Sequence, residues 1–304
     1  STQLSTDGSR SIVYGQSVHR DEFGISKGTF WSPDGNRLAF YRMDQSMVTD
    51  YPQVNIPEIG FNHPETQSCI ATAAPDKYPM AGETSHKVTV GVYDVKANKV
   101  IYLKAGDPTD RYFTNIAWSP DNKVIYMFEL NRDQNDCRLV SYNAETGNKI
   151  AELYRETDEK YVEPLHPIQF LPWDSNKFIM QSQKDGYNHL YLCNLKGNNI
   201  EMKQLTSGKW VVMDVLGFYP KHKSIVIASN EYSPIQRNIF LVDISTGKRT
   251  IADDNGKGWH NATLSESGKY IYDNYSTPTV PRKIAIVNNE LGDRIPYFTA
   301  ENPW

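Results

Sequence analysis

Two adjacent carboxylates, Asp21 and Glu22, are the residues of this chain whose types and spacing are best suited to binding chemistry. A protonated amine, such as a peptide N-terminus with a pKa of about 8, is held best by fixed carboxylates, because charge-assisted hydrogen bonds are the strong ones. Two acids also disfavour a ligand whose amine is blocked, since a buried carboxylate without a partner is costly. The alternative is a solvated acidic turn whose charge is balanced by His19, Arg20 and Lys27.

Other reactive residue types occur without the spacing that catalysis or metal binding needs. Gly24–Gly28 matches the G-x-S-x-G pattern of a serine hydrolase, but that elbow requires a strand before it and a helix after it. Here a charged stretch precedes the motif and the strand-like Thr29–Trp31 follows it. Seven histidines are scattered singly, and Cys69, Cys137 and Cys193 have no C-x-x-C spacing. We therefore expect no metal, no cofactor and no readable disulfide framework.

Composition favours a β-rich domain with a substantial core. The 304 residues are 39% hydrophobic and 12% aromatic, with 19 tyrosines, and aromatic residues fit the pleated surface of a sheet. A net charge of −4 and the lack of a Lys/Arg run argue against nucleic-acid binding. Apolar runs stop well short of the ~20 residues of a membrane span. The chain opens without a leader, so it is either cytoplasmic or has a secretion signal outside this sequence. Because the chain looks cut at both ends, we expect the second, with a periplasmic or extracellular location.

Internal repetition predicts the architecture. Near copies of a Trp-Ser-Pro-Asp turn begin at Trp31 and Trp118, and weaker copies begin at Phe170, Phe218 and Leu264. The last four starts lie 46 to 52 residues apart, close to the length of a four-stranded propeller blade. In these turns Pro fixes the first position and Gly or Asn tolerates the positive φ that follows. A second hairpin follows each copy, so every unit supplies four antiparallel strands.

The sequence therefore predicts an all-β chain whose residues 1–304 form a partial β-propeller of about five blades, plus a remnant strand at Ser11–Tyr14. The 87 residues from Trp31 to Trp118 are too many for one blade, and the excess falls in a Pro-rich excursion over residues 46–85. This excursion is either a surface loop or an arm that contacts a partner or a second copy. Its apolar residues, which favour a contact role, are Tyr51, Ile56, Ile59, Phe61 and Ile70.

Several segments together resemble the propeller domain of the dipeptidyl peptidase IV family of serine exopeptidases. These segments are Val18–Pro33, Leu38–Asp44, Tyr78–Gly82, Val88–Asp94, Asp185–Tyr191, Leu205–Trp210 and Ser229–Glu231. The resemblance runs through almost the whole chain. It implies an eight-bladed propeller, of which about five blades are present, that caps an α/β-hydrolase domain. It also implies a chain truncated at both ends, with the hydrolase domain and its catalytic Ser, Asp and His absent, so that this chain alone hydrolyses nothing.

The resemblance also implies a role for the acid pair. In the family, a pair of glutamates on a short helix inserted in a blade holds the amine of the substrate, which sets a dipeptide such as X-Pro as the product. By position Asp21 and Glu22 correspond to that pair, and Glu22 is the stronger candidate. This chain has Arg20-Asp21-Glu22 where the family has consecutive glutamates. The sequence therefore leaves open whether one or two carboxylates bind the amine. Residues 46–85 fall where the family has a dimerisation arm, which implies a homodimer.

Two rival functions account for part of the sequence. A stand-alone interaction propeller of the TolB or WD type, which binds a protein or glycan, would explain the excursion and the missing triad but not the acid pair. A five-bladed glycosidase needs two carboxylates that face each other across a pocket, and adjacent Asp21 and Glu22 do not supply that separation. The function we expect is a non-catalytic propeller region whose partners are a peptide N-terminus and its own hydrolase domain.

Overall fold

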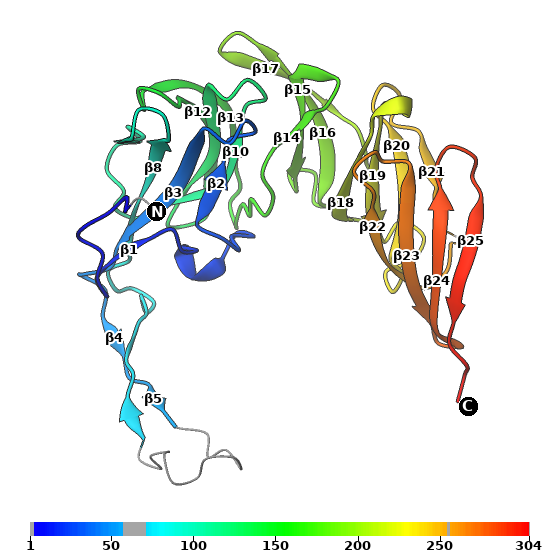
Figure 1. Ribbon diagram of the computed structural model, residues 1–304, viewed down its shortest axis with the longest axis horizontal. Helices are drawn as coiled ribbons and strands as arrows, with labels where there is room; N and C mark the ends of the chain where they lie inside the picture. The colour runs from blue at the N-terminus through cyan, green and yellow to red at the C-terminus, as the bar shows by residue number, and fades with distance from the viewer. Residues whose placement is uncertain (1–2, 57–70, 254–255, 304) are drawn as a thin grey trace.

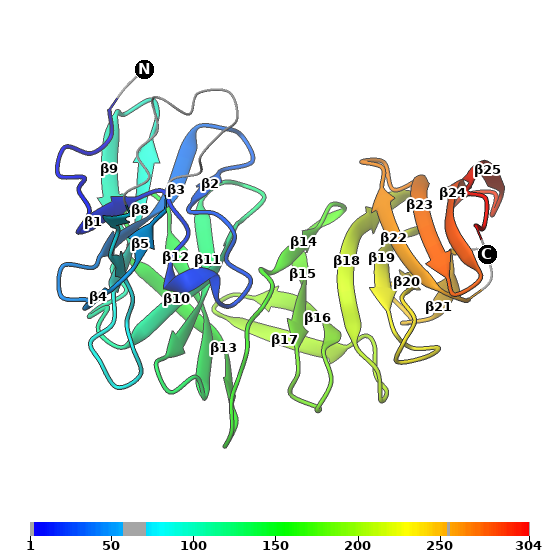
Figure 2. The same ribbon diagram turned by 90° about the horizontal axis from the view of Figure 1, so that it is seen from below.

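The computed structural model describes residues 3–56, 71–253 and 256–303, which form an open arc of antiparallel sheets (Figure 1). The sheets follow one another along the arc in chain order, and the turned view shows each one standing beside the next (Figure 2). In the described residues there are five such sheets, besides two short two-stranded ladders. The predicted β-propeller of four-stranded antiparallel blades is thereby confirmed.

Each blade is built from strands that are consecutive, or nearly so, in the sequence. The first blade holds β1 (Ile12–Tyr14), β2 (Thr29–Trp31), β3 (Arg37–Asp44), β8 (Lys87–Asp94) and β9 (Lys99–Tyr102). The second holds β10 (Arg111–Trp118), β11 (Val124–Asn131), β12 (Asp136–Asn143) and β13 (Lys149–Thr157). The third holds β14 (Gln169–Leu171), β15 (Asp174–Ser182), β16 (His189–Lys196) and β17 (Asn199–Gln204).

The last two blades follow the same order. The fourth holds β18 (Val212–Tyr219), β19 (Ser224–Ser229), β20 (Asn238–Asp243) and β21 (Arg249–Ile251). The fifth holds β22 (Trp259–Leu264), β23 (Tyr270–Thr277), β24 (Val280–Asn288) and β25 (Arg294–Thr299). Among the residues that the structure describes, two short helical turns accompany the strands, η1 (His19–Asp21) and η3 (Pro220–His222).

A serine side chain closes the predicted turn in its two near copies. In the first blade the hydroxyl of Ser32 donates to Asp34 (2.6 Å) and accepts the backbone N–H of Arg37 (2.9 Å). In the second, Ser119 bonds in the same way to Asp121 (2.6 Å) and to the N–H of Val124 (2.9 Å). A short polar side chain thus reinforces the backbone bonds of the turn. This turn is a local property of a few residues, which is why the sequence reveals it.

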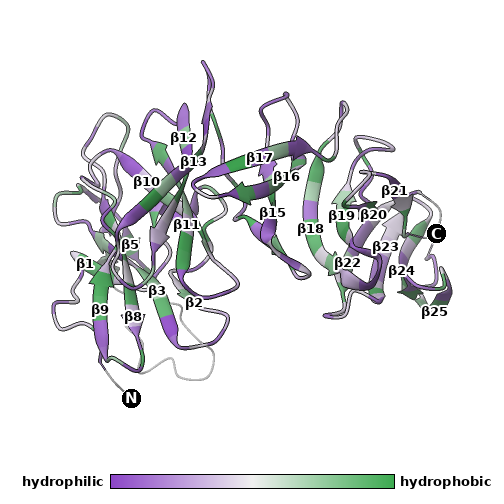
Figure 3. Ribbon diagram, turned by 90° about the horizontal axis from the view of Figure 1, so that it is seen from above, coloured by the Kyte–Doolittle hydropathy of each residue, from purple (hydrophilic) through white to green (hydrophobic). Residues whose placement is uncertain are grey.

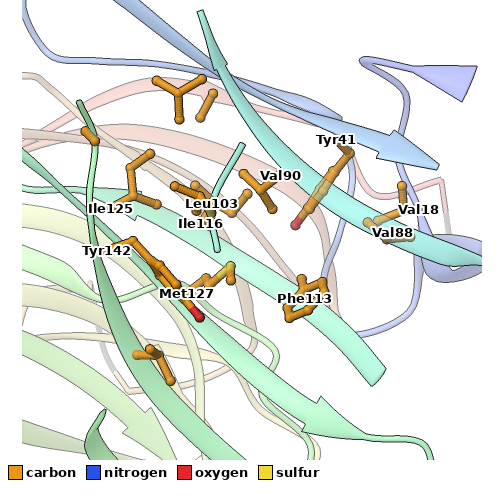
Figure 4. Packing of buried hydrophobic residues seen from close by; sticks show 14 of the residues in the cluster. Val18, Tyr41, Val88, Val90, Leu103, Phe113, Ile116, Ile125, Met127 and Tyr142 are labelled. Carbon is orange, nitrogen blue, oxygen red and sulfur yellow. The ribbon is translucent and has the colours of Figure 1, made fainter. Parts of the chain in front are cut away.

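The hydrophobic core lies between neighbouring blades. Tyr41 and Val90 of the first blade share a cluster with Phe113 and Tyr142 of the second (Figure 4), and comparable clusters join each later pair of blades. A blade with neighbours on both sides is covered on both faces, and its central strand can be buried continuously, as over Ile125–Leu130 of β11. Strand β18, whose residues are mostly half-buried, instead mixes hydrophobic and hydrophilic residues (Figure 3).

Strand β1 corrects one expectation, because Ser11–Tyr14 is not the remnant of a preceding blade. β1 pairs with β3, where Tyr14 lies opposite Arg42, and β2 continues along the same edge of β3, where Thr29 lies opposite Phe40. The two strands are halves of one interrupted strand. The sequence conceals this continuity because a loop separates the halves.

The described parts of the Pro-rich excursion of residues 46–85, namely 46–56 and 71–85, project from the first blade as a narrow hairpin, the arm hereafter (Figure 1). Its strands are β4 (Asp50–Tyr51) paired with β7 (Asp76–Lys77), and β5 (Val54–Asn55) paired with β6 (Thr72–Ala73). An ion pair between Arg10 and Asp50 (2.7 Å) ties its base to the segment before β1. Tyr51 and Ile56 are exposed. Of the other apolar residues predicted there, Ile59, Phe61 and Ile70 lie outside the described residues.

Neither a membrane helix nor a metal cluster is found in the part of the chain that the structure describes. No helix there is long and apolar enough to cross a bilayer, and no group of three His, Cys, Asp or Glu side chains could hold an ion. Burial raises the pKa of the Cys137 thiol and raises that of Cys193 to about 12. Both remain protonated thiols at neutral pH, and Cys69 lies outside the described residues.

A buried histidine holds the fifth blade together. His260 is fully buried, and its ring nitrogens lie 2.9 Å from Asp273 and 2.8 Å from the carbonyl oxygen of Lys257. Burial lowers the pKa of His260, but the hydrogen bond to Asp273 and the charges of Asp273 and Asp253 outweigh it, so the pKa is raised. Since both ring nitrogens face acceptors, the imidazolium is the form that the folded blade favours.

We expect the fifth blade to loosen as the pH rises. With the folded pKa above the unfolded value of about 6.5, the stabilisation is complete below pH ~6.5 and is lost as the pH rises through the folded pKa. Hydrogen exchange of β22 and β23, corrected for intrinsic rates, should show less protection at pH 9 than at pH 6. The Asp273→Asn variant should lose this dependence and Asp293→Asn, on an exposed turn, should keep it. Equal protection at both pH values in the unmodified protein would contradict the assignment.

Candidate functional site

The acid pair lies in a loop, residues 16–27, that interrupts the first strand of the first blade. The N–H of Gly15 donates to the carbonyl of Tyr41 (2.9 Å), and the N–H of Tyr41 donates to the carbonyl of Gly28 (3.0 Å). The loop therefore leaves and rejoins the sheet at a single residue of β3. A Cβ at Gly28 would lie 2.0 Å from the carbonyl oxygen of Gln16, so only glycine fits at this closure.

Buried apolar side chains on both sides of the acid pair anchor the loop. Val18 and Ile25 enter the cluster between the first and second blades, and Phe23 enters the cluster between the second and third. Asp21 and Glu22, between these anchors, are exposed. The loop, dark blue in Figure 2, thus presents its carboxylates from a base fixed in two interfaces. This arrangement preorganises the acids without burying them.

The anchored segment has an unusual backbone. η1 is a left-handed turn in which His19, Arg20 and Asp21 have φ values of 54°, 59° and 63°. The N–H groups of Asp21 and Glu22 donate to the carbonyls of Val18 and His19, both at 3.2 Å. This conformation costs roughly 1–2 kcal/mol for each residue other than glycine. It persists because the surrounding contacts fix it, and such strain is concentrated at functional sites.

His19 is one of those contacts. It is buried, its Nε2 accepts the N–H of Phe113 (3.2 Å), and its ring stands edge-on to Tyr112 at 4.9 Å. Burial, helped by the nearby His86, lowers the pKa of His19 to about 3. The imidazole is therefore neutral at physiological pH and braces the turn against β10.

Asn115 is a second brace. It lies at the bulge of β10 with a φ of 55°. Its Nδ2 donates to the carbonyls of Phe23 (3.1 Å) and Pro164 (2.6 Å), and thereby joins the loop to the segment between the second and third blades. Gly24 packs so closely there that a Cβ would lie 2.1 Å from the carbonyl oxygen of Leu165. The position of the turn thus depends on three blades.

The two carboxylates line different cavities. Asp21 lines a cavity of about 250 Å³ that Asp76 of the arm also lines. Glu22 lines a neighbouring cavity of about 270 Å³ whose walls include Tyr78 and Tyr112. Burial raises the pKa of Tyr112, and the charge of Glu22 acts in the same direction, so its hydroxyl stays protonated. Within the described residues neither acid has a side-chain hydrogen bond or ion pair, so both can accept an external cation.

The basic residues that the sequence offered as balancing charges have other partners. His19 is neutral, Arg20 pairs with Asp76 (2.8 Å), and the Lys27 ammonium lies over the ring of Phe30 at 5.2 Å. A self-neutralised acidic turn therefore does not describe this loop.

The sequence did not reveal how this loop is held. Asn115, the buried role of His19 and the pairing of Arg20 with Asp76 all depend on contacts between residues 56 to 94 positions apart. Such contacts have no local signature, although an acid pair between buried apolar residues was visible. The G-x-S-x-G motif is not a nucleophile elbow, because strand β2 follows Ser26 where a helix would be required.

An arc of four-stranded antiparallel blades, with an acid-bearing loop inserted in the first strand of one blade, defines a protein of the β-propeller class. Residues 1–282 match the model of the family described as the dipeptidyl peptidase IV (DPP IV) N-terminal region. The chain belongs to this family.

Relatives with solved structures share the fold closely. A candidate dipeptidyl aminopeptidase IV from Bacteroides ovatus is 46% identical, with a TM-score of 0.87 over 98% of this chain and 43% of that one. Porphyromonas gingivalis dipeptidyl peptidase 4 is 26% identical, with a TM-score of 0.82 over 99% of this chain and 41% of that one. A probable dipeptidyl-aminopeptidase B of Pyrenophora teres is 28% identical over 99% of this chain. The chain spans about a third, 35%, of the length of that relative.

Replacement of Asn115 should loosen the turn. Asn115→Ala leaves the carbonyls of Phe23 and Pro164 without their donor and places alanine at positive φ, so we expect a loss of about 2–3 kcal/mol in unfolding free energy. Urea denaturation measures this loss, and hydrogen exchange over residues 19–25 should accelerate. Asn115→Gly also lacks the side-chain donor but adopts the positive φ without strain, so it should lose less unfolding free energy than Asn115→Ala. Unchanged exchange over residues 19–25 in both variants would show that Asn115 does not hold the turn.

Proposed function

We propose that this chain is the propeller region of a DPP IV-like serine peptidase and that its acidic turn anchors the free N-terminal amine of peptide substrates. The observation that carries the proposal is the pair Asp21 and Glu22, which is exposed and unpaired within the described residues and is held on a strained, deeply anchored turn. Membership of the family supports the same reading.

The cavity beside Glu22 suits an ammonium group. A peptide amine is mostly protonated at neutral pH, and Glu22 offers it a charge-assisted bond. Tyr78 and Tyr112 add aromatic surface, which also favours cations. Glu22 is therefore the principal anchor in our proposal, and Asp21, on the adjacent cavity, adds negative potential close by.

The chemical step belongs to a hydrolase domain of the full-length protein, and this chain alone is inactive in our proposal. An amine held at a fixed distance from the nucleophile limits the product to a dipeptide, and X-Pro is the preferred sequence. The propeller in addition gates access to the chamber that it forms with the hydrolase domain. This chain covers about a third of the length of the named peptidase relatives, which supports a division of labour between a propeller region and a hydrolase domain.

Neutralisation of Glu22 tests the proposal. In the full-length protein, Glu22→Gln should lower kcat/KM for a chromogenic Gly-Pro substrate about 10- to 100-fold, because a hydrogen bond to a charged group is lost. The preference for a free over an acetylated N-terminus should shrink with it. Glu145→Gln, on an exposed turn of the second blade, serves as the matched control and should stay within about twofold of the unmodified protein. An unchanged kcat/KM in Glu22→Gln would refute Glu22 as the anchor.

We further propose that the arm forms a homodimer contact. Val54 and Ile56, which are 64% and 72% exposed, place apolar surface on a thin hairpin away from the core. Contiguous apolar surface of this kind is typical of protein interfaces.

A charge on the arm should therefore weaken self-association. We expect Val54→Asp to raise the dimer dissociation constant at least about tenfold, because the carboxylate would be desolvated at the contact. Sedimentation velocity over a concentration series gives this constant. Val95→Asp, at an exposed valine on the turn after β8, is the control for a surface charge as such. Dimers of equal stability in the two variants would exclude the arm as the contact.

A further inference from the structure

Arg20 lies beside the proposed amine site, where its positive charge can compete with a substrate amine for Asp21 and Glu22. It precedes Asp21 in the sequence and lines both cavities, together with Asp21 in one and Glu22 in the other. A guanidinium is a strong, bidentate partner for carboxylates. Without another ion-pair partner, the guanidinium of Arg20 is attracted to the two carboxylates, as the amine of a substrate is.

The base of the arm holds Arg20 elsewhere. Its guanidinium pairs with Asp76 of β7 at 2.8 Å and lies over the ring of Tyr78 at 4.9 Å. Three described acids line these two cavities: Asp21, Glu22 and Asp76. Of these three, Arg20 forms an ion pair with Asp76. Within the described residues, Asp21 and Glu22 have no ion-pair partner.

The arm base is itself fixed, which makes it a suitable anchor. Asp50 of β4 pairs with Arg10 (2.7 Å) and with Lys77 (3.2 Å), and β4 pairs with β7. The ammonium of Lys77 also donates to the carbonyl of Val48 (2.7 Å). These contacts hold β7, and with it Asp76, in place.

We propose that Arg20 is a positioning residue of the site, and that Asp76 and Tyr78 of the arm hold its guanidinium away from Asp21 and Glu22 so that both acids stay available to an amine. The inference rests on the proposed function and adds to it a dependence of the amine site on the arm. A tethered competitor has an effective concentration in the millimolar range. Released, Arg20 acts as a competitive inhibitor in cis, which raises KM and leaves kcat unaffected because saturating substrate displaces it.

Asp76→Asn tests the inference in the full-length protein. We expect KM for a Gly-Pro substrate to rise about three- to tenfold with little change in kcat. In the Arg20→Gln background the same substitution should have no further effect on KM. Asp94→Asn, which removes an ion pair with Arg37 (3.0 Å) in the first blade but lines neither cavity, should keep the KM of the unmodified protein. An equal rise in Asp94→Asn, or a rise that persists in the Arg20→Gln background, overturns the inference.

A crystal structure of Asp76→Asn gives a second readout that does not depend on activity. The Arg20 guanidinium should move to within hydrogen-bond distance of Asp21 or Glu22, and its continued stacking on Tyr78 would overturn the inference. The two proposals fail differently. A wild-type kcat/KM in Glu22→Gln refutes the amine anchor, whereas a collapse in Glu22→Gln combined with a wild-type KM in Asp76→Asn refutes the role of Arg20 alone.

Discussion

The site depends on the backbone N–H and carbonyl of one residue, Tyr41. Its carbonyl accepts from Gly15 and its N–H donates to Gly28, so a loop of twelve residues, 16–27, opens from one position of β3 and closes at the same position. The sheet continues undisturbed on both sides of this position, through β1 and β2. The inserted loop therefore has no freedom to slide along the strand. Its direction is fixed by the blade, and the side chains on it are fixed in turn by what they contact.

The loop divides its residues between anchoring and presentation. Val18, Phe23 and Ile25 join two different interfaces between blades, and their burial offsets the cost of the left-handed turn between them. A turn anchored at only one interface could rotate about it. Anchored at two, the turn holds its acids in place, and preorganised charge is what recognition of a small cation requires.

The parts of the fold that the sequence predicts are those with local causes. A turn such as Ser32 to Arg37 closes on itself within six residues, so its repetition down the chain reveals the blades. The acid pair is likewise visible because the two residues are adjacent. The sequence predicts Ser11–Tyr14 as a remnant strand outside the five blades, because β2, which continues β1, follows only after the loop. The braces His19 and Asn115 were invisible, since each contacts residues more than ninety positions away in the sequence.

The order of the two acids has a physical reason in the backbone. Asp21 has a φ of 63°, a conformation in which a short side chain such as aspartate is tolerated better than glutamate. Glu22 has a φ of −65° in extended backbone, where any residue fits, and the longer side chain can reach into the cavity with Tyr78 and Tyr112. Aspartate at 21 therefore meets the needs of the turn, while glutamate at 22 meets those of the cavity. Under the proposed function, this division makes Glu22 the principal anchor and leaves Asp21 as a neighbouring negative charge.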